Sequence, residues 1–307
     1  MNKIIRIGTR DSELALWQAE TVQQELEKLG HAVVLVPIKS LGDQVLDRPL
    51  YELGVTGVFT KALDLALLEG QIDIAVHSMK DVPTQLPKGL AQGAVLKRAN
   101  FRDVLVHKSS NFLNSDRPAT IATGSLRRKV QWLNRYPHHQ VVDLRGNVNS
   151  RLLKLIENPW QGAIFAQAGL ERIKLLPPDA IVLDWMVPAP AQGAIVVVGR
   201  QGDTAVHKVA PLHDTDSGLC TTVEREFLRT LEGGCSAPIG ALAQIKDGTV
   251  SFVGVLFSLD GTQKHEVTKE VALADAKGLG VLCAEEILKK GGDKLMKQIR
   301  NADHTID

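Results

Sequence analysis

The chain has 307 residues and is 44% hydrophobic, which is enough for two or three domains with real cores and excludes a disordered protein. A formal net charge of +1 and an aromatic content of 4% exclude a broad nucleic-acid surface and a platform for stacking bases. No stretch has the ~20 apolar residues of a membrane-spanning helix, and the first residues lack the apolar run of a signal peptide. Three widely spaced cysteines show no metal-ligand pattern. We therefore expect a cytoplasmic protein without disulfides, membrane contact or bound metal.

The first third of the chain alternates strand and helix patterns. Ser12 is a suitable N-cap for a helix that Gly30 closes, and a second helix is predicted over residues 61–68. A glycine-rich segment over residues 42–57 predicts a mobile loop. Short apolar runs predict strands over residues 4–7, 32–38 (buried) and 73–77. This βαβ order predicts a mostly parallel sheet with helices on its faces.

A second unit of the same style begins near Phe101. Its predicted helix covers residues 149–156, and its predicted strands cover 104–107, 120–123, 140–143 and 163–166. A strand over residues 192–198 could cross back to the first unit. The fold class is therefore α/β, with two lobes of the periplasmic-binding-protein type, crossing hinge strands and a ligand cleft between the lobes.

The C-terminal part predicts a small α+β domain. Thr221 and Glu224 have the spacing of a capping box at the start of a helix, with Cys220 as an apolar staple before it. An antiparallel sheet is predicted, with hairpin turns at Asp247-Gly248 and Asp260-Gly261. Its strands cover residues 236–244, 249–257 and 264–273, and a last helix covers 274–290.

A basic segment lies between Ser125 and Arg151. It contains six Lys or Arg and one acid, Asp143, which gives a local balance of +5. Its arginines stand beside Gly, Ser and Asn, where backbone N–H groups are free and a guanidinium can grip a carboxylate or phosphate with two bonds. A solvated basic face is the alternative explanation. The pattern favours a small ligand with several negative groups.

Polar residues also follow two predicted strands of the first unit. Asp81, beside Lys80, is a candidate acid/base or cation-stabilising carboxylate at the end of a strand, where α/β proteins build their sites. A surface ion pair is the alternative. Arg10 precedes a helix and suits an anion, although simple exposure would also explain it.

Cys235 follows two glycines, between a predicted helix and a predicted strand. An exposed thiol near a basic cleft would have a stabilised thiolate and become nucleophilic. Burial is the commoner state of cysteine, and Cys220 and Cys283 fit that description. No His-Asp partner set accompanies Cys235, so a protease-like triad has little support.

Five motifs in one order closely resemble the porphobilinogen deaminase (hydroxymethylbilane synthase) family, over about residues 6–240. They are Thr9-Arg10 with Ser12-Glu13-Leu14-Ala15-Leu16-Trp17-Gln18-Ala19, His77-Ser78-Met79-Lys80-Asp81-Val82-Pro83, Ser125-Leu126-Arg127-Arg128, Leu144-Arg145-Gly146-Asn147-Val148 and Glu232-Gly233-Gly234-Cys235.

The resemblance implies an enzyme that joins four porphobilinogen molecules head to tail, releases ammonia at each step and ends with linear hydroxymethylbilane. It implies a dipyrromethane cofactor on Cys235, attached through a thioether, and a catalytic carboxylate at Asp81 that faces the pyrrole nitrogens. The carboxylates of cofactor and substrate would be bound by Arg10, Ser12, Ser78, Lys80, Ser125, Arg127, Arg128, Arg145, Arg151 and Arg172.

Three departures from the family's usual motifs stand in this sequence. Thr56 replaces the usual loop lysine, so its role is absent or passes to Lys61, whereas Gly57 and Phe59 remain and keep a closing lid plausible. The stretch before Arg127 has one serine fewer than usual. Asn100 begins a hinge that is usually Asp-Pro-Arg-Asp, which makes this hinge less rigid.

The resemblance also implies a domain division, and a monomer is expected because the sequence shows no obvious self-pairing edge. Residues 1–97 and 194–214 would form domain 1, residues 101–191 domain 2, and residues 217–307 domain 3 with Cys235. A two-lobed solute-binding or effector-sensing protein for a small polycarboxylate is the non-enzymatic alternative, and it leaves Cys235 unexplained. Nucleic-acid binding through the basic segment is a third hypothesis, which the near-neutral charge disfavours.

Overall fold

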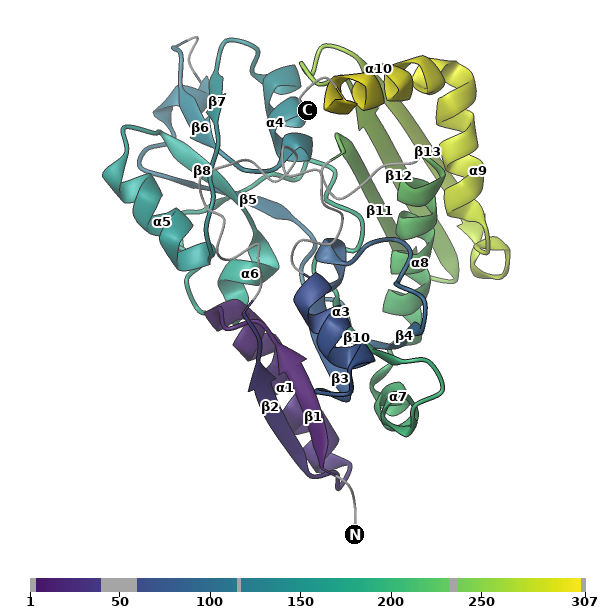
Figure 1. Ribbon diagram of the computed structural model, residues 1–307. Helices are drawn as coiled ribbons and strands as arrows, with labels where there is room; N and C mark the ends of the chain where they lie inside the picture. Colours follow the sequence, from purple (N-terminus) through teal and green to yellow (C-terminus); the bar gives the residue numbers. More distant parts are fainter. Residues whose placement is uncertain (1–3, 40–59, 115–116, 232–236, 305–307) are drawn as a thin grey trace.

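The computed structural model describes residues 4–39, 60–114, 117–231 and 237–304 (Figure 1). They form two five-stranded mixed sheets and one three-stranded antiparallel sheet. The predicted α/β class, with two lobes and an antiparallel third domain, is confirmed. The loop predicted over residues 42–57, including Thr56 and Gly57, lies outside the described residues, as do Phe59 and Cys235.

Lobe 1 contains the sheet β2-β1-β3-β10-β4, at the bottom of Figure 1. Strand β1 is parallel to β2 and β3, whereas β10 is antiparallel to β3 and β4. The predicted return of the chain to the first unit is thereby confirmed, because β10 comes late in the sequence. The strands are β1 (Ile5–Thr9), β2 (Val33–Pro37), β3 (Ile74–Ser78), β4 (Leu90–Val95) and β10 (Ile195–Arg200).

Lobe 2 repeats this pattern in the sheet β7-β6-β8-β5-β9, with two parallel pairs followed by two antiparallel pairs. Its fourth strand, β5, follows directly on lobe 1, as β10 follows on lobe 2. Two chain segments, residues 96–102 and 183–194, therefore cross between the lobes. The strands are β5 (Asp103–His107), β6 (Thr120–Ala122), β7 (Gln140–Val142), β8 (Gly162–Ala166) and β9 (Ile181–Val182).

Helices cover the faces of both sheets. Helix α1 packs Ala19, Val22 and Leu26 against Ile7 and Ile74 of lobe 1, which buries the apolar stripe that its sequence predicts. Lobe 1 contains α1 (Glu13–Lys28), α3 (Lys61–Leu68), α7 (Thr204–Val209), η2 (Met79–Asp81) and η4 (Ala210–Leu212). Lobe 2 contains α4 (Leu126–Arg135), α5 (Val148–Glu157), α6 (Gln167–Arg172) and η3 (Asn111–Asn114).

The third domain packs helices on one face of its sheet, around Phe227 and Phe252. Asp247 and Gly248 both have positive φ, at 50° and 75°, which confirms the predicted tight hairpin turn. The elements are α8 (Thr215–Thr230), β11 (Ile239–Lys246), β12 (Thr249–Phe257), β13 (Lys264–Ala272), η5 (Leu273–Asp275), α9 (Leu279–Ile287), η6 (Leu288–Gly292) and α10 (Asp293–His304).

The predicted capping box at Thr221 and Glu224 is wrong. Helix α8 begins two turns earlier, where Asp214 is the N-cap and accepts a hydrogen bond from the Ser217 N–H at 2.8 Å. Thr221 instead bonds back to the Ser217 carbonyl within the helix, at 2.7 Å. Cys220 is buried inside α8, so it is not a staple before it.

Two further predictions need correction. The strand predicted as buried over residues 32–38 is the edge strand β2, and it is only half-buried. The last helix, predicted over residues 274–290, is α9 followed by a break at Gly291, where φ is 105°, and then by α10.

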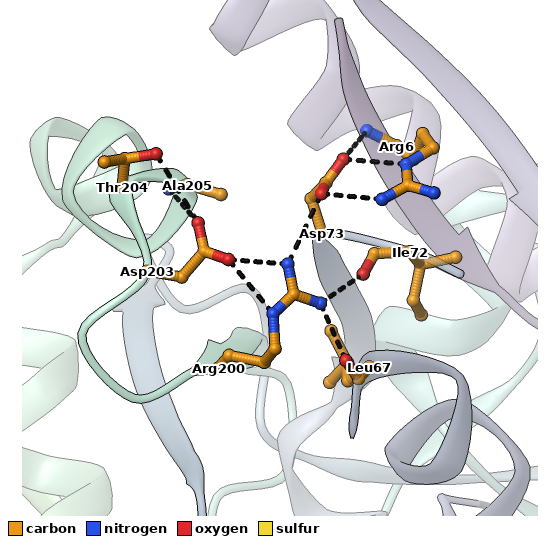
Figure 2. Close-up of polar contacts among 8 residues, drawn as sticks. All are labelled: Arg6, Leu67, Ile72, Asp73, Arg200, Asp203, Thr204 and Ala205. Carbon is orange, nitrogen blue, oxygen red and sulfur yellow. Dashed lines mark hydrogen bonds and ion pairs between the residues drawn. The ribbon is translucent and has the colours of Figure 1, made fainter. Parts of the chain in front are cut away.

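A network of ion pairs lies at one end of the lobe 1 sheet (Figure 2). It is the end away from Thr9 and Ser78, the last residues of β1 and β3. Arg6 donates to Asp73 from Nε at 3.0 Å and from Nη2 at 2.9 Å, and these bonds raise the pKa of Arg6. Arg200 lies 3.4 Å from the same carboxylate and binds Asp203 at 2.5 Å. We call these four residues the basal network. Each of its guanidiniums has a carboxylate partner.

Candidate active site

The carboxyl end of β3 turns directly into η2, which presents Lys80 and Asp81. The Met79 N–H donates to the Ala194 carbonyl at 3.0 Å, so the turn starts on the crossing segment. Gln18, buried in α1, donates to the Ser78 hydroxyl at 2.8 Å and orients it. The predicted site at the end of this strand is therefore built from two elements of lobe 1.

A buried glutamine links this turn to lobe 2. Gln192 is fully buried; it accepts from Lys80 Nζ at 3.3 Å and donates to Asp103 at 2.9 Å. Burial, the largest cause, and the positive charge of Arg128 lower the pKa of Lys80 to about 8, against the raising effect of Asp81. Lys80 is therefore a cation held in a positive field, at the junction of the two lobes.

Arg127 and Arg128 lie in the first turn of α4 and are buried, at 4% and 5% exposed. Both bind Asp103, Arg127 at 2.8 Å and Arg128 at 2.8 Å. Their charges hold the pKa of Asp103 far below its ordinary value, although burial alone would raise it. Arg127 also donates to the Val187 carbonyl at 2.8 Å, and Arg128 to the Ile164 carbonyl at 2.9 Å. Two guanidiniums share one carboxylate here, which leaves a net positive charge.

Arg145 and Arg151 flank the N-terminus of α5. Gly146 has φ 110°, and Asn147 caps the helix by accepting from the Ser150 N–H at 2.9 Å. Arg151 Nε donates to the Gly146 carbonyl at 2.7 Å. Burial lowers the pKa of both arginines, and Arg128 and Arg145 help to lower that of Arg151 to about 10. Both remain cations at neutral pH.

Arg172 ends α6 and reaches the crossing segment. Its Nη2 donates to the Gly193 carbonyl at 2.7 Å, and its guanidinium carbon lies 5.5 Å from the centre of the Trp17 ring of α1. Burial lowers the pKa of Arg172 to about 10. Arg172 therefore touches both lobes.

Electrostatic coupling joins the predicted residues across the lobes. Arg151 of lobe 2 interacts with Asp81 and Arg10 of lobe 1, and Lys80 interacts with Arg127 and Arg128. We call the set of charged residues that these couplings and contacts bring together the interlobe cluster. Its members are Arg10, Lys80, Asp81, Asp103, Arg127, Arg128, Arg145 and Arg151, and we add Arg172 because it contacts both the crossing segment and α1 of lobe 1.

Three buried guanidiniums of this cluster are incompletely satisfied. The Nε atoms of Arg127, Arg145 and Arg172 are buried and have no hydrogen-bond partner within the described part of the chain. Buried polar groups without partners are costly and rare in folded proteins. Orphaned donors on three cations of lobe 2 indicate a site for an acidic ligand, whose carboxylates would supply the missing acceptors.

The predicted serines lie at helix N-termini. Ser12 and Ser125 are the N-cap residues of α1 and α4, but neither hydroxyl accepts a capping hydrogen bond. Among the described residues, neither hydroxyl hydrogen-bonds to a member of the interlobe cluster. Both hydroxyls stand where helix N-termini favour an anion.

Asp103, Gln192 and Glu224 hold this site together, but the sequence pattern gives none of them that role, and it assigned Glu224 to a capping box instead. Glu224 is fully buried and accepts from Arg98 at 2.6 Å, so it ties the crossing segment to α8. Asp103 had one visible signal: it follows Arg102 at the start of a strand, where a buried acid needs a cationic partner. Gln192 has no such signal.

Two mixed sheets joined by crossing segments, with a guanidinium-rich cluster at their junction, define a two-lobed protein with a candidate site for an acidic small molecule. Two family models match the chain. One is described as porphobilinogen deaminase, dipyromethane cofactor binding domain, over residues 5–208, and the other as porphobilinogen deaminase, C-terminal domain, over residues 218–289. The chain belongs to the porphobilinogen deaminase family.

Curated relatives extend this similarity over nearly the whole chain. A protein named porphobilinogen deaminase from Syntrophotalea carbinolica is 43% identical over 298 residues, which cover 95% of each chain. Another of that name from Chlorobium phaeobacteroides is 39% identical and covers 98% of this chain and 99% of its own. A third, from Desulforamulus reducens, is 40% identical, with 98% and 99% covered.

Solved structures with a similar arrangement include the methionine-binding protein MetQ, at 15% identity and a TM-score of 0.46, with 70% of this chain and 91% of that chain covered. An ancestral cationic amino acid solute-binding protein has 15% identity and a TM-score of 0.44, with 68% and 87% covered. Among the residues that the structure describes, no helix is long and apolar enough to span a bilayer.

The residues present fit the family's dipyrromethane cofactor. An acidic bipyrrole carries several carboxylates on a flat apolar frame, and the cluster offers lobe 2 guanidiniums with unfilled donors, Arg127, Arg145 and Arg172. The three N-termini of α1, α4 and α5 add further N–H donors for anions.

Proposed function

We propose that this chain condenses four porphobilinogen molecules head to tail onto a dipyrromethane primer bound to Cys235, releases ammonia each time and yields linear hydroxymethylbilane. The observation that carries the proposal is that lobe 2 guanidiniums, three of them with an orphaned Nε, are coupled electrostatically to Asp81 and Lys80 of lobe 1 through Arg127, Arg128 and Arg151. The bound primer supplies a nucleophilic pyrrole carbon. The chain's own residues hold carboxylates, orient the rings and manage charge.

We assign carboxylate binding to Arg10, Ser12, Ser78, Lys80, Ser125, Arg127, Arg128, Arg145, Arg151 and Arg172. Arg145 and Arg172 support this assignment best, because each is a guanidinium with an orphaned Nε. Arg127 and Arg128 already share Asp103. They would therefore attract the ligand's carboxylates through the one positive charge that remains on these three residues. Ser78 is oriented by Gln18 and would add a neutral donor.

Asp81 is assigned the catalytic role. Loss of ammonia from porphobilinogen leaves a positive charge that spreads onto the substrate's pyrrole nitrogen. A fixed carboxylate beside that nitrogen stabilises the charge and can accept a proton at its oxygen as the new bond forms. The half-buried Asp81 is coupled electrostatically to Lys80 of its own turn and to Arg151 of lobe 2.

The domain division, a lid over the site, the cellular location and the oligomeric state are further proposals. We propose domain 1 over residues 1–97 and 194–214, domain 2 over 101–191 and domain 3 over 217–307. A lid containing Thr56, Gly57 and Phe59 would close on the substrate, with Lys61 as the nearest cation in sequence to replace the missing lysine. We propose a cytoplasmic monomer that binds no nucleic acid or membrane.

Intact-mass measurement tests the proposal directly. Protein produced in cells that make porphobilinogen should exceed its sequence mass by one covalent dipyrrole, and an acidic aldehyde reagent should colour it. Cys235→Ser should remove both signals, whereas the matched Cys283→Ser should keep them, because Cys283 is buried in the core of the third domain. A wild-type protein of bare sequence mass would favour a polycarboxylate-binding protein instead.

A further inference from the structure

Arg225, in the middle of α8, binds the backbone of the turn that carries Lys80 and Asp81. Its Nη1 donates to the Val82 carbonyl at 2.9 Å and to the Met79 carbonyl at 3.3 Å. Its Nη2 donates to the Pro83 carbonyl at 2.6 Å. The acceptors bracket the two functional residues on both sides. A guanidinium of the third domain thus holds a lobe 1 turn more than 140 residues away in sequence.

Core packing of Met79 and Val82, together with the Met79 N–H bond to Ala194, holds the start of the turn, but few hydrogen bonds hold its far side. Within η2, the Val82 N–H closes on the Met79 carbonyl at 3.2 Å, and Pro83 has no N–H to donate. Among the described residues, no backbone N–H donates to the carbonyls of Val82 or Pro83. Charge-assisted hydrogen bonds are about twice as strong as neutral ones, so Arg225 supplies the principal restraint on this side of the turn.

Helix α8 is itself anchored to the crossing segments. Glu224, the preceding residue, accepts from Arg98 at 2.6 Å, from the Ala191 N–H at 2.6 Å and from the Ala243 N–H at 2.8 Å. Arg225 therefore projects from a fixed platform. The same helix ends five residues before Cys235 in the sequence.

We propose that Arg225 is a positioning residue, which holds Asp81 and Lys80 in register with the cofactor-bearing third domain. This inference rests on the function proposed for Asp81. Arg225 itself touches backbone carbonyls and contributes no group to the reaction.

The test compares Arg225→Met, Arg225→Lys and the control Arg229→Met, which removes the same charge from an exposed position one turn further along α8. We expect Arg225→Met to lower kcat by roughly 10²-fold, as a misplacement of about 1 Å does, with KM within about threefold. Arg225→Lys keeps the charge but not the fork, so it should recover part of the loss. Arg229→Met should retain full kcat.

Amide hydrogen exchange of Val82 gives a readout apart from activity. Its protection comes from the η2 bond, so Arg225→Met should speed its exchange at least tenfold, with Val76 of β3 unchanged. The double variant Arg225→Met/Asp81→Asn should be no slower in turnover than Asp81→Asn alone, because both changes act at one carboxylate.

Unchanged Val82 exchange in Arg225→Met would overturn the inference, whatever the activity. If that variant does not fold, Arg225→Lys carries the same two measurements, and normal exchange with normal kcat in it overturns the inference. Faster exchange with full kcat also overturns it. If Asp81→Asn has full kcat as well, the function proposed for Asp81 fails separately.

Discussion

The basal network and the interlobe cluster use the same side chain for opposite purposes. In the basal network, two arginines meet two aspartates, and each guanidinium has a carboxylate within 3.4 Å (Figure 2). In the interlobe cluster, six arginines and a lysine surround Asp81 and Asp103. Arg151 and Arg172 donate to the backbone carbonyls of Gly146 and Gly193. Paired arginines stabilise lobe 1, whereas the cluster is built to receive negative charge.

This contrast has an energetic consequence. A buried cation without a counterion destabilises a fold by several kcal/mol, whereas a paired cation carries no such penalty. The interlobe cluster is tolerated because each unfilled donor becomes a binding contact when an acidic ligand enters. Ligands that bind the folded state also stabilise it, so the bound cofactor should hold the two lobes together.

The largest expected effect is the difference in kcat between Asp81→Asn in the interlobe cluster and Asp73→Asn in the basal network. Asp81→Asn keeps the volume but removes the charge that steadies the cation, so we expect kcat to fall at least ~10²-fold while cofactor loading is retained. Single-turnover kinetics and intact mass check the two parts. Asp73→Asn in the basal network is the matched control and should keep kcat within about twofold in protein that remains folded. Near-normal turnover in Asp81→Asn would refute the assigned role.

The next largest effect is the difference in kcat/KM and melting temperature between Arg145→Met and Arg6→Met. Arg145 is 8% exposed, has an orphaned Nε and lies beside no carboxylate that bonds it in the described chain. One charge-assisted bond is worth about 1.5–3 kcal/mol, so Arg145→Met should lower kcat/KM by roughly 10–100-fold. The melting temperature should hold or rise, because a buried unpaired charge is removed.

Arg6→Met gives the complementary result, with intact kcat/KM and a lower melting temperature, since Arg6 serves Asp73 alone among the contacts shown in Figure 2. Equal kinetic losses in both variants would show that the two clusters do not differ in role.

Much of the fold followed from local pattern. The predictions for residues 61–68 and 249–257 match α3 and β12, because each has clear periodicity and ends at a glycine or turn. Helix α4 has no such signal, since its buried face includes Arg127, Arg128 and Gln131. The spacing of Thr221 and Glu224 imitated a capping box, but α8 had already begun at Asp214.

The sequence predicted which residues form the site, but it did not predict which of them bond to one another. Strand ends and basic turns identify Asp81, Arg145 and Arg151 from the sequence. That Arg128 bonds Asp103, 25 residues earlier, depends on how α4 packs on β5. The Arg225 contacts with η2 depend on the docking of the third domain, which no local pattern encodes.

A smaller effect concerns stability alone. Asp73 is 3% exposed and accepts from both Arg6 and Arg200, which are 34% and 23% exposed. Asp73→Asn weakens these bonds, but the half-exposed guanidiniums can turn to water. We therefore expect a loss of about 1–2 kcal/mol in the free energy of unfolding, measured by urea denaturation. A loss below about 0.3 kcal/mol would mean that the basal network does not stabilise lobe 1.

The smallest effect concerns the pH dependence of Lys80, whose pKa is lowered from 10.5 to about 8. Between these values the unfolded chain keeps a proton that the folded chain has lost, so the free energy of unfolding should rise with pH in this window. The gain should stay below about 1 kcal/mol because Lys80 is only half-buried.

Over the same interval the Lys80 ammonium that binds carboxylates loses its proton, so kcat/KM should fall a few-fold from pH 7.5 to 9. This interval lies below the range where Arg151 titrates. Lys80→Gln should remove both the rise in the free energy of unfolding and the fall in kcat/KM over this pH range. A wild-type kcat/KM that stays level across this interval, with the same flat line in Lys80→Gln, would show that the Lys80 charge plays no part in binding.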